Sequence, residues 1–350
     1  MKTTMKRLDL NHCVPILRWK KAEQHALARL DEHHKAHVTP LIELVPHIFT
    51  RKEKDGQTVR LNSEQVVNKV GEQLVRSCDR HPFFLDLCHL TGNAIDQDPE
   101  RFLTVLGRHA STLRLSLIPV TGVARSRPYQ SAVGEVAGIH GQGVCLRLTA
   151  DDISHATLTE DISSLLRVLK LAPEVVDVIV DFQTTQESAP EFASLCALVH
   201  FVSEWRNLVV ASGAFPENLS ELPKNNQYKL QRSDWLSWKH QVSAAPVPAR
   251  LPLYSDYAIQ YPRYQERTGP MHLSASIRYT AESYWVVMRG ESVSNPNGPG
   301  FAQWPANALL LCERPEYCGE TFSYGDRYIH QKSSQFDQPG NATTWLEAGI

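Results

Sequence analysis

Short apolar runs recur along the chain, and most of them carry one charged or polar residue near the C-terminal end. Helix-length segments separate most of these runs. Strands that alternate with helices are typical of a parallel sheet. Eight repeats favour an α/β fold of the (β/α)8 type, a TIM-like barrel. The expected strands are Val14–Arg18, Thr39–Glu43, Phe83–Asp86, Leu115–Pro119, Val144–Arg147, Val178–Asp181, Leu208–Ser212 and Leu253–Asp256.

Apolar residues at helical spacing predict the helices between these strands. Asn62 and Ser63 supply N-cap chemistry to a helix that continues through Leu74. Asp98-Pro99 opens the next helix, where the missing N–H of proline costs least. Further helices are expected over 20–34, 128–139, 158–171, 190–204, 233–242, 302–313 and 325–334.

The strand–helix rhythm breaks after Ala214. We expect residues 1–350 to form a single (β/α)8-like barrel domain with irregular insertions at about 214–250 and 258–301. Ten of the eleven tyrosines and five of the seven tryptophans lie after residue 227, so the C-terminal third carries a Tyr/Trp-rich insertion. These rings either line a cleft or stack on nucleic-acid bases, or they pack the insertion against the barrel. We favour the packing interpretation.

Composition narrows the functional classes. The net charge of −2 gives no global attraction to nucleic acid or membrane. The N-terminus has no apolar core of a signal peptide, and the chain has no apolar run of membrane-spanning length. Seven scattered cysteines favour a reducing, cytoplasmic setting. Dinucleotide-binding, P-loop, serine-hydrolase and zinc-protease motifs are absent, so no motif names a reaction.

The positions of the charged residues nevertheless predict where a site lies. Strand side chains alternate between the barrel interior and the surrounding helices. If the charged residue points inward, both of its neighbours face helices and must be apolar. Four strands meet this condition, which places four charged side chains inside the barrel near its C-terminal rim: Glu43, Asp86, Arg147 and Asp181. Arg18 and Lys20 from the first strand, and Asp256 and Tyr257 from the eighth, are expected to join them.

Two interpretations of this cluster stay open. Buried charges are costly unless they are paired or bind something. In the first interpretation, Arg18 and Arg147 form a self-satisfied ion-pair network with the carboxylates. In the second, the cluster is a ligand pocket: the substrate-binding residues are Arg18, Lys20, Arg147, Asp256 and Tyr257, and the basic ones grip a phosphate or carboxylate. The catalytic residues are then Glu43, Asp86 and Asp181, which act as acid and base or hold a divalent metal such as Mg²⁺.

A zinc site is not expected. Cys78-x-x-His81 and Cys88-His89 bracket the third strand, and a strand between two ligand pairs points them apart.

Two N-terminal stretches and one C-terminal stretch carry a family resemblance. Residues 14–23 (VPILRWKKAE), 39–46 (TPLIELVP) and 340–345 (GNATTW) resemble the phage "beta protein" family. These segments bracket nearly the whole chain. The resemblance implies a barrel-like single domain and a role in phage–host conflict, and it carries over no catalytic residue.

The sequence therefore supports two functions from different classes. In the first, the barrel binds or processes an anionic, phosphate-bearing small molecule or nucleotide at its C-terminal mouth. In the second, the protein is a non-catalytic recognition component in phage defence or counter-defence, with a protein or nucleic-acid partner. A nucleic-acid partner is less favoured, because no basic run interleaved with aromatic residues is present. No membrane partner is expected.

Overall fold

Eight parallel strands form the centre of the molecule. The computed structural model describes residues 6–53, 55–90, 98–184, 195, 199–244, 250–266 and 274–350. The sheet order is β1-β2-β5-β6-β7-β8-β9-β11. All eight strands predicted from the sequence are confirmed, with boundaries shifted by a few residues. Their bounds are β1 Ile16–Arg18, β2 Leu41–Glu43, β5 Phe83–Asp86, β6 Leu117–Thr121, β7 Val144–Thr149, β8 Val176–Thr184, β9 Asn207–Gly213 and β11 Leu253–Ser255.

The sheet is nearly closed into a barrel. Residues at its two edges meet through backbone hydrogen bonds: the amide of Val14 donates to the carbonyl of Tyr254 (3.2 Å), and that of Ile16 to the carbonyl of Asp256 (2.8 Å). The Ser255 hydroxyl also donates to the Val14 carbonyl, at 2.5 Å. These bonds join β11 to the segment that leads into β1.

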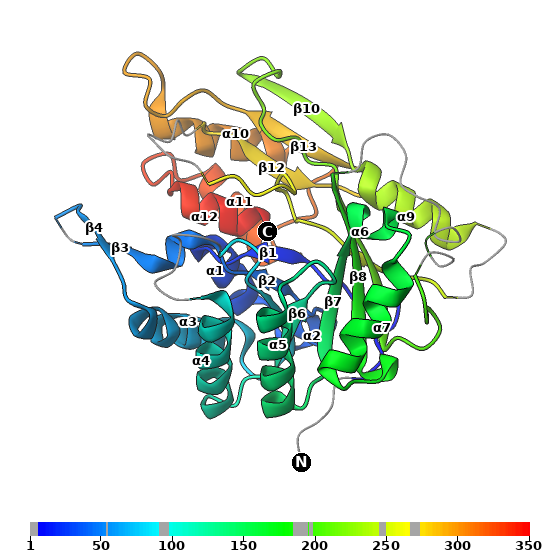
Figure 1. Ribbon diagram of the computed structural model, residues 1–350. Coiled ribbons are helices and arrows are strands. Elements are labelled where there is room, and N and C mark those ends of the chain that lie inside the picture. The colour runs from blue at the N-terminus through cyan, green and yellow to red at the C-terminus, as the bar shows by residue number, and fades with distance from the viewer. Residues whose placement is uncertain are drawn as a thin grey trace.

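Helices cover the outside of the strands, and Figure 1 shows α3, α4, α5 and α7 flanking them. The predicted Asn62 cap is confirmed, because its side chain accepts from the Gln65 amide while the Gln65 side chain accepts from the Asn62 amide. The helix expected over 20–34 is two helices, because Asp31 caps a second one. The helix expected over 190–204 falls largely outside the described residues. Helix bounds in this half are α1 Lys21–Arg29, α2 Glu32–Lys35, α3 Ser63–Cys78, α4 Pro99–Thr112, α5 Arg127–His140, α6 Ala150–Ser154 and α7 Leu158–Leu169.

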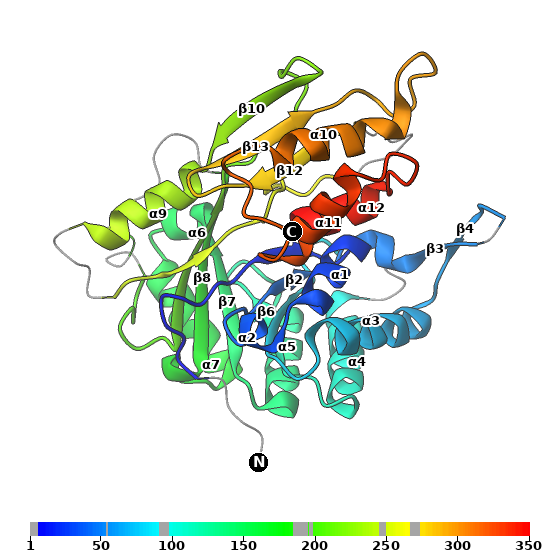
Figure 2. The same ribbon diagram turned by 180° about the vertical axis from the view of Figure 1, so that it is seen from behind.

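A second, antiparallel sheet lies beyond the barrel in the C-terminal third, in the order β10-β13-β12. Its strands fall in segments that we expected to be irregular: β10 Asn226–Gln231, β12 Ile277–Thr280 and β13 Tyr284–Arg289. Figures 1 and 2 both show this sheet and α10 above the barrel, with α11 and α12 between them and α1. The helices of this third are α9 Ser233–Ser243, α10 Gln303–Cys312, α11 Tyr324–Ser333 and α12 Ala342–Gly349. A short hairpin, β3 Thr50–Lys52 and β4 Thr58–Arg60, projects from the barrel side.

The cores follow this division. The barrel interior is filled by apolar side chains such as Ile16, Phe84 and Ile179, and a larger cluster lies between strands and outer helices. The small sheet packs on α10–α12 through Trp304, Trp345 and others. Buried tyrosines contribute to these cores, as the packing interpretation predicts. Among the described residues, no helix is long and apolar enough to cross a membrane.

Candidate functional site

One arginine stands at the centre of the C-terminal end of the barrel. Arg147 on β7 is 8% exposed, and all five of its N–H groups have an acceptor. Nε donates to Asp181 (3.0 Å) and Nη2 to Asp181 (2.6 Å) and the Tyr257 hydroxyl (3.1 Å). Nη1 donates to Glu43 and Asp86, both at 2.8 Å. The four side chains that strand alternation placed inside the barrel therefore do meet there.

The three carboxylates are equally engaged, because each of their six oxygens accepts a hydrogen bond. Besides Arg147, Asp86 accepts from the Cys88 amide (2.9 Å) and from Arg125 (3.0 Å). Asp181 accepts from the Gln183 amide (2.8 Å) and from the Tyr257 hydroxyl (2.6 Å). The second oxygen of Glu43 lies 3.0 Å from His89 Nε2. A divalent cation would have to displace these donors, so the carboxylates are not arranged to hold Mg²⁺.

Electrostatics agree with this pairing. Burial acts to raise the pKa of Glu43, but Arg147 and the hydrogen bond from His89 outweigh it and hold the pKa at about 2. The network thus sets the carboxyl groups of Glu43, Asp86 and Asp181 against the guanidinium groups of Arg147, Arg18 and Arg125. This part of the site is an ion-pair network, as the first interpretation of the sequence proposed.

Arg18 on β1 occupies the rim of this network. Its Nη2 donates to the carbonyls of Tyr261 (2.7 Å) and Pro262 (2.6 Å), and its Nε lies 4.0 Å from Glu43. That Nε is buried and has no hydrogen-bond partner among the described residues. The segment that follows β11 thus covers Arg18 and ties the last barrel strand to the first.

Three rim residues were not predicted from the sequence. His89 and Arg125 keep 21% and 27% of their side chains exposed while their inner ends bind Glu43 and Asp86. Cys88 lies between them, and burial raises the pKa of its thiol. Each residue stands two to four positions beyond the end of its strand. That position at the C-terminal face of a barrel is the signal that could have found them.

Two expected site residues do not join the network. Lys20 is exposed, and its Nζ lies 5.7 Å from the centre of the Tyr264 ring, which also packs on His89 at 4.5 Å. Asp256 points away from the barrel interior, because it has the same strand parity as Tyr254, whose hydroxyl donates to it at 3.2 Å. The inward position is taken by Tyr257 instead, whose hydroxyl accepts from Arg147.

One cluster at the rim has ligand atoms of the kind that zinc uses. A Glu43 oxygen, the Cys88 sulfur and a His89 nitrogen all lie within 4.8 Å of one another. Arg147 contacts the same sulfur at 3.7 Å and the same carboxylate. A guanidinium in this position repels a dication, so these residues fit a hydrogen-bonded cluster better than a metal centre.

Fold and site together define an α/β-barrel protein whose C-terminal mouth holds a buried network of ionised side chains. The chain belongs to the Beta protein family, which matches residues 14–350 and thereby confirms the resemblance found in the sequence.

Comparison with other known proteins adds little. No curated protein matches the chain. Solved structures similar to it include 3-dehydroquinate dehydratase from Enterococcus faecalis, at 10% identity and a TM-score of 0.33, covering 61% of this chain and 85% of that one. Another is alanine racemase from Clostridium difficile 630 in complex with cycloserine, at 10% identity and a TM-score of 0.32, covering 74% of this chain and 53% of that one. At these values neither similarity says anything about activity.

Proposed function

We propose that the protein binds and processes a phosphate-bearing small molecule or nucleotide at the C-terminal mouth of the barrel. The observation that carries this proposal is the pair of half-open rim groups, His89 and Arg125, each anchored from below by a buried carboxylate. An anchored guanidinium is preorganised to bind a phosphate oxygen. An imidazole oriented by a carboxylate is placed to move a proton.

The roles differ from those expected from sequence. Arg147 has no N–H left for a ligand, so Arg125 and Lys20 are the groups that would bind the anion. Glu43, Asp86 and Asp181 would then act as positioning residues, because Arg147 holds all three of them. His89 is the candidate catalytic residue. Its ring nitrogen that faces away from Glu43 is the one available for proton transfer.

Ligand-induced stabilisation tests this proposal. Nucleotides and sugar phosphates are screened by thermal unfolding, since a ligand at about 100 times its Kd stabilises the folded state by about 2.7 kcal/mol. We expect at least one of them to stabilise the protein, and Arg125→Gln and Lys20→Gln to reduce that shift. Arg108→Gln is the matched control, because Arg108 pairs with Glu135 on the helical surface.

Two results would contradict the proposal. One is that no compound in the screen stabilises the wild-type protein. The other is that both rim variants keep the full ligand-induced shift, each measured against its own ligand-free protein.

A second candidate is the non-catalytic recognition component in phage–host conflict. Large apolar side chains are exposed around the C-terminal helices, including Leu309, Leu310 and Phe322, the last of them 70% exposed. Contiguous apolar patches mark protein-binding surfaces, and the neighbouring Leu309 and Leu310 are the side chains that would contribute to one here. Under this candidate, the double variant Leu309→Ser/Leu310→Ser abolishes the effect of the protein on phage infection. His89→Ala leaves that effect intact.

A further inference from the structure

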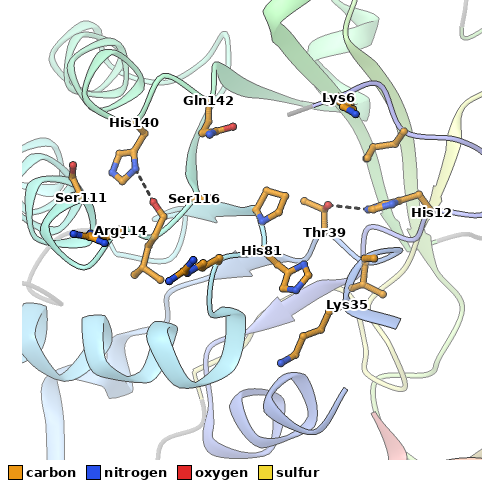
Figure 3. A pocket seen from close by; sticks show the side chains of 16 residues that line it. Lys6, His12, Lys35, Thr39, His81, Ser111, Arg114, Ser116, His140 and Gln142 are labelled. Carbon is orange, nitrogen blue, oxygen red and sulfur yellow. Dashed lines mark hydrogen bonds between the residues drawn. The ribbon is translucent and has the colours of Figure 1, made fainter. Parts of the chain in front are cut away.

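A cavity lies at the opposite end of the barrel from the proposed site. Its volume is about 650 Å³, within the range of small-molecule sites. The lining residues come from the turns that lead into β1, β2, β5, β6 and β7, so the cavity sits at the N-terminal ends of the strands. Figure 3 shows His12 and Thr39, His81 and Lys35, and Arg114 and His140 arranged around it.

The cavity is strongly basic. Lys6, Lys35, Arg80 and Arg114 line it, and no Asp or Glu is among its described lining residues. Two carboxylates act on lining residues: Glu32 lies 3.7 Å from Lys35 and 3.1 Å from His81, and Asp9 acts electrostatically on His12. Neither carboxylate pairs with Arg80 or Arg114 among the described residues.

The two arginines hold equivalent places in successive turns. Arg80 stands three residues before β5, and Arg114 three residues before β6. Both turns contain a residue with a left-handed backbone, Asp79 (φ 49°) and Arg114 itself (φ 59°). Each lies at the C-terminal end of a helix, α3 or α4, where a positive φ is a common way to end the helix and turn the chain toward the next strand. Neither guanidinium has a hydrogen-bond or ion-pair partner within the part of the chain that the structure describes.

The remaining lining residues are a mixture of polar side chains and small or aliphatic ones, the latter including Val38 and Leu115. Thr39, Ser111 and Ser116 offer hydroxyl groups. Burial lowers the pKa of His12 to about 4, so its ring is neutral, and its Nε2 lies 2.8 Å from the Thr39 hydroxyl. Among the described residues that line the cavity, no Phe, Tyr or Trp is present to stack on a base. The ligand would therefore be recognised by its charged group.

We propose that this cavity binds the oligophosphate group of a small molecule, with Arg80 and Arg114 as its principal ligands. A guanidinium donates two parallel hydrogen bonds to a phosphate, so two guanidiniums that line one cavity can together bind an oligophosphate. The site is separate from the barrel mouth and does not depend on the function proposed there.

Calorimetric titration with inorganic pyrophosphate tests the site directly. We expect saturable binding, and a rise in Kd of about tenfold or more in the Arg80→Gln/Arg114→Gln double variant, which corresponds to about 1.4 kcal/mol. Arg76→Gln is the matched control: Arg76 lies one turn earlier on α3, pairs with Glu72 and does not line the cavity. Arg125→Gln distinguishes this site from the one at the barrel mouth. We expect this substitution to leave pyrophosphate binding unchanged.

Three outcomes would overturn the proposal. Pyrophosphate does not bind the wild-type protein, or it binds the double variant with wild-type affinity, or Arg76→Gln weakens it as much as the double variant does. ADP and a short single-stranded oligonucleotide are titrated as well. Binding of the oligonucleotide without binding of pyrophosphate or ADP would also reject a small-molecule site.

Discussion

At the scale of single residues, strand alternation was enough to bring Glu43, Asp86, Arg147 and Asp181 together. It could not say how the charges divide among them, because that depends on side-chain reach. Arg147 donates hydrogen bonds to all three carboxylates and has no N–H group left. Only the other rim side chains can therefore bind a ligand. His89 and Arg125 lie in loops, where the sequence has no periodicity to fix a direction, so they could not be placed in advance.

Acid titration should expose the role of Glu43. Its pKa is lowered to about 2 in the folded protein, so its ionised form stabilises the fold at neutral pH. This contribution to the free energy of unfolding is about 3 kcal/mol. It is present in full above about pH 4.5 and is lost as the pH falls toward 2. We expect urea unfolding to show Glu43→Gln less stable than wild type at pH 7, with the difference shrinking below pH 4.5. Glu72→Gln, on the exposed surface of α3, is the control. Parallel pH curves for Glu43→Gln and wild type would contradict this account.

At the scale of elements, the barrel strands could be predicted and the small sheet could not. Barrel strands are buried on both faces and form continuous apolar runs between turn residues. By contrast, β10 has the sequence NQYKLQ and is mostly exposed. It becomes a strand because β13 pairs with it along its whole length, from Asn226 opposite Arg289 to Gln231 opposite Tyr284. A segment that becomes a strand only by pairing with another strand has no strong strand pattern in its own sequence.

Helix α3 offers a clean test of an element that the sequence did specify. Asn62→Ala removes the side-chain oxygen that accepts the hydrogen bond from the Gln65 amide, and should cost about 1 kcal/mol of unfolding free energy. Its neighbour Ser63 is a built-in control, because the Ser63 hydroxyl is buried and has no partner among the described residues. We expect Ser63→Ala to be neutral or slightly stabilising in chemical denaturation. Equal losses from both substitutions would show that the cap contributes nothing specific.

At the scale of the whole molecule, the C-terminal helices connect the small sheet to the barrel. Helix α12 packs beside α1, and Glu347 binds His25 at 3.0 Å and also Arg29. The Glu347 side chain is buried, whereas both partners are about half exposed. This contact joins the small sheet and its helices to the beginning of the barrel. No local pattern in either segment could have predicted it.

Loss of this contact should loosen two distant segments together. Glu347→Gln removes the charge and should cost about 1–3 kcal/mol. Amide hydrogen exchange should then rise in α12 and α1 and stay unchanged in β7 and β8. Glu282→Gln is the control, since its pair with Lys239 lies on the exposed surface. Faster exchange throughout the chain, or in α12 alone, would contradict a direct bridge.

The hydrogen bond between Ser255 and Val14 has a consequence for synthesis on the ribosome. The two residues are 241 positions apart. At translation rates of 5–20 residues per second, the edge of β1 stays without its partner for roughly 10–50 s after it emerges. During that interval an apolar parallel edge is open to pairing with other nascent chains. We therefore expect the junction between β1 and β11 to be the part of this protein that most needs chaperones during folding in the cell.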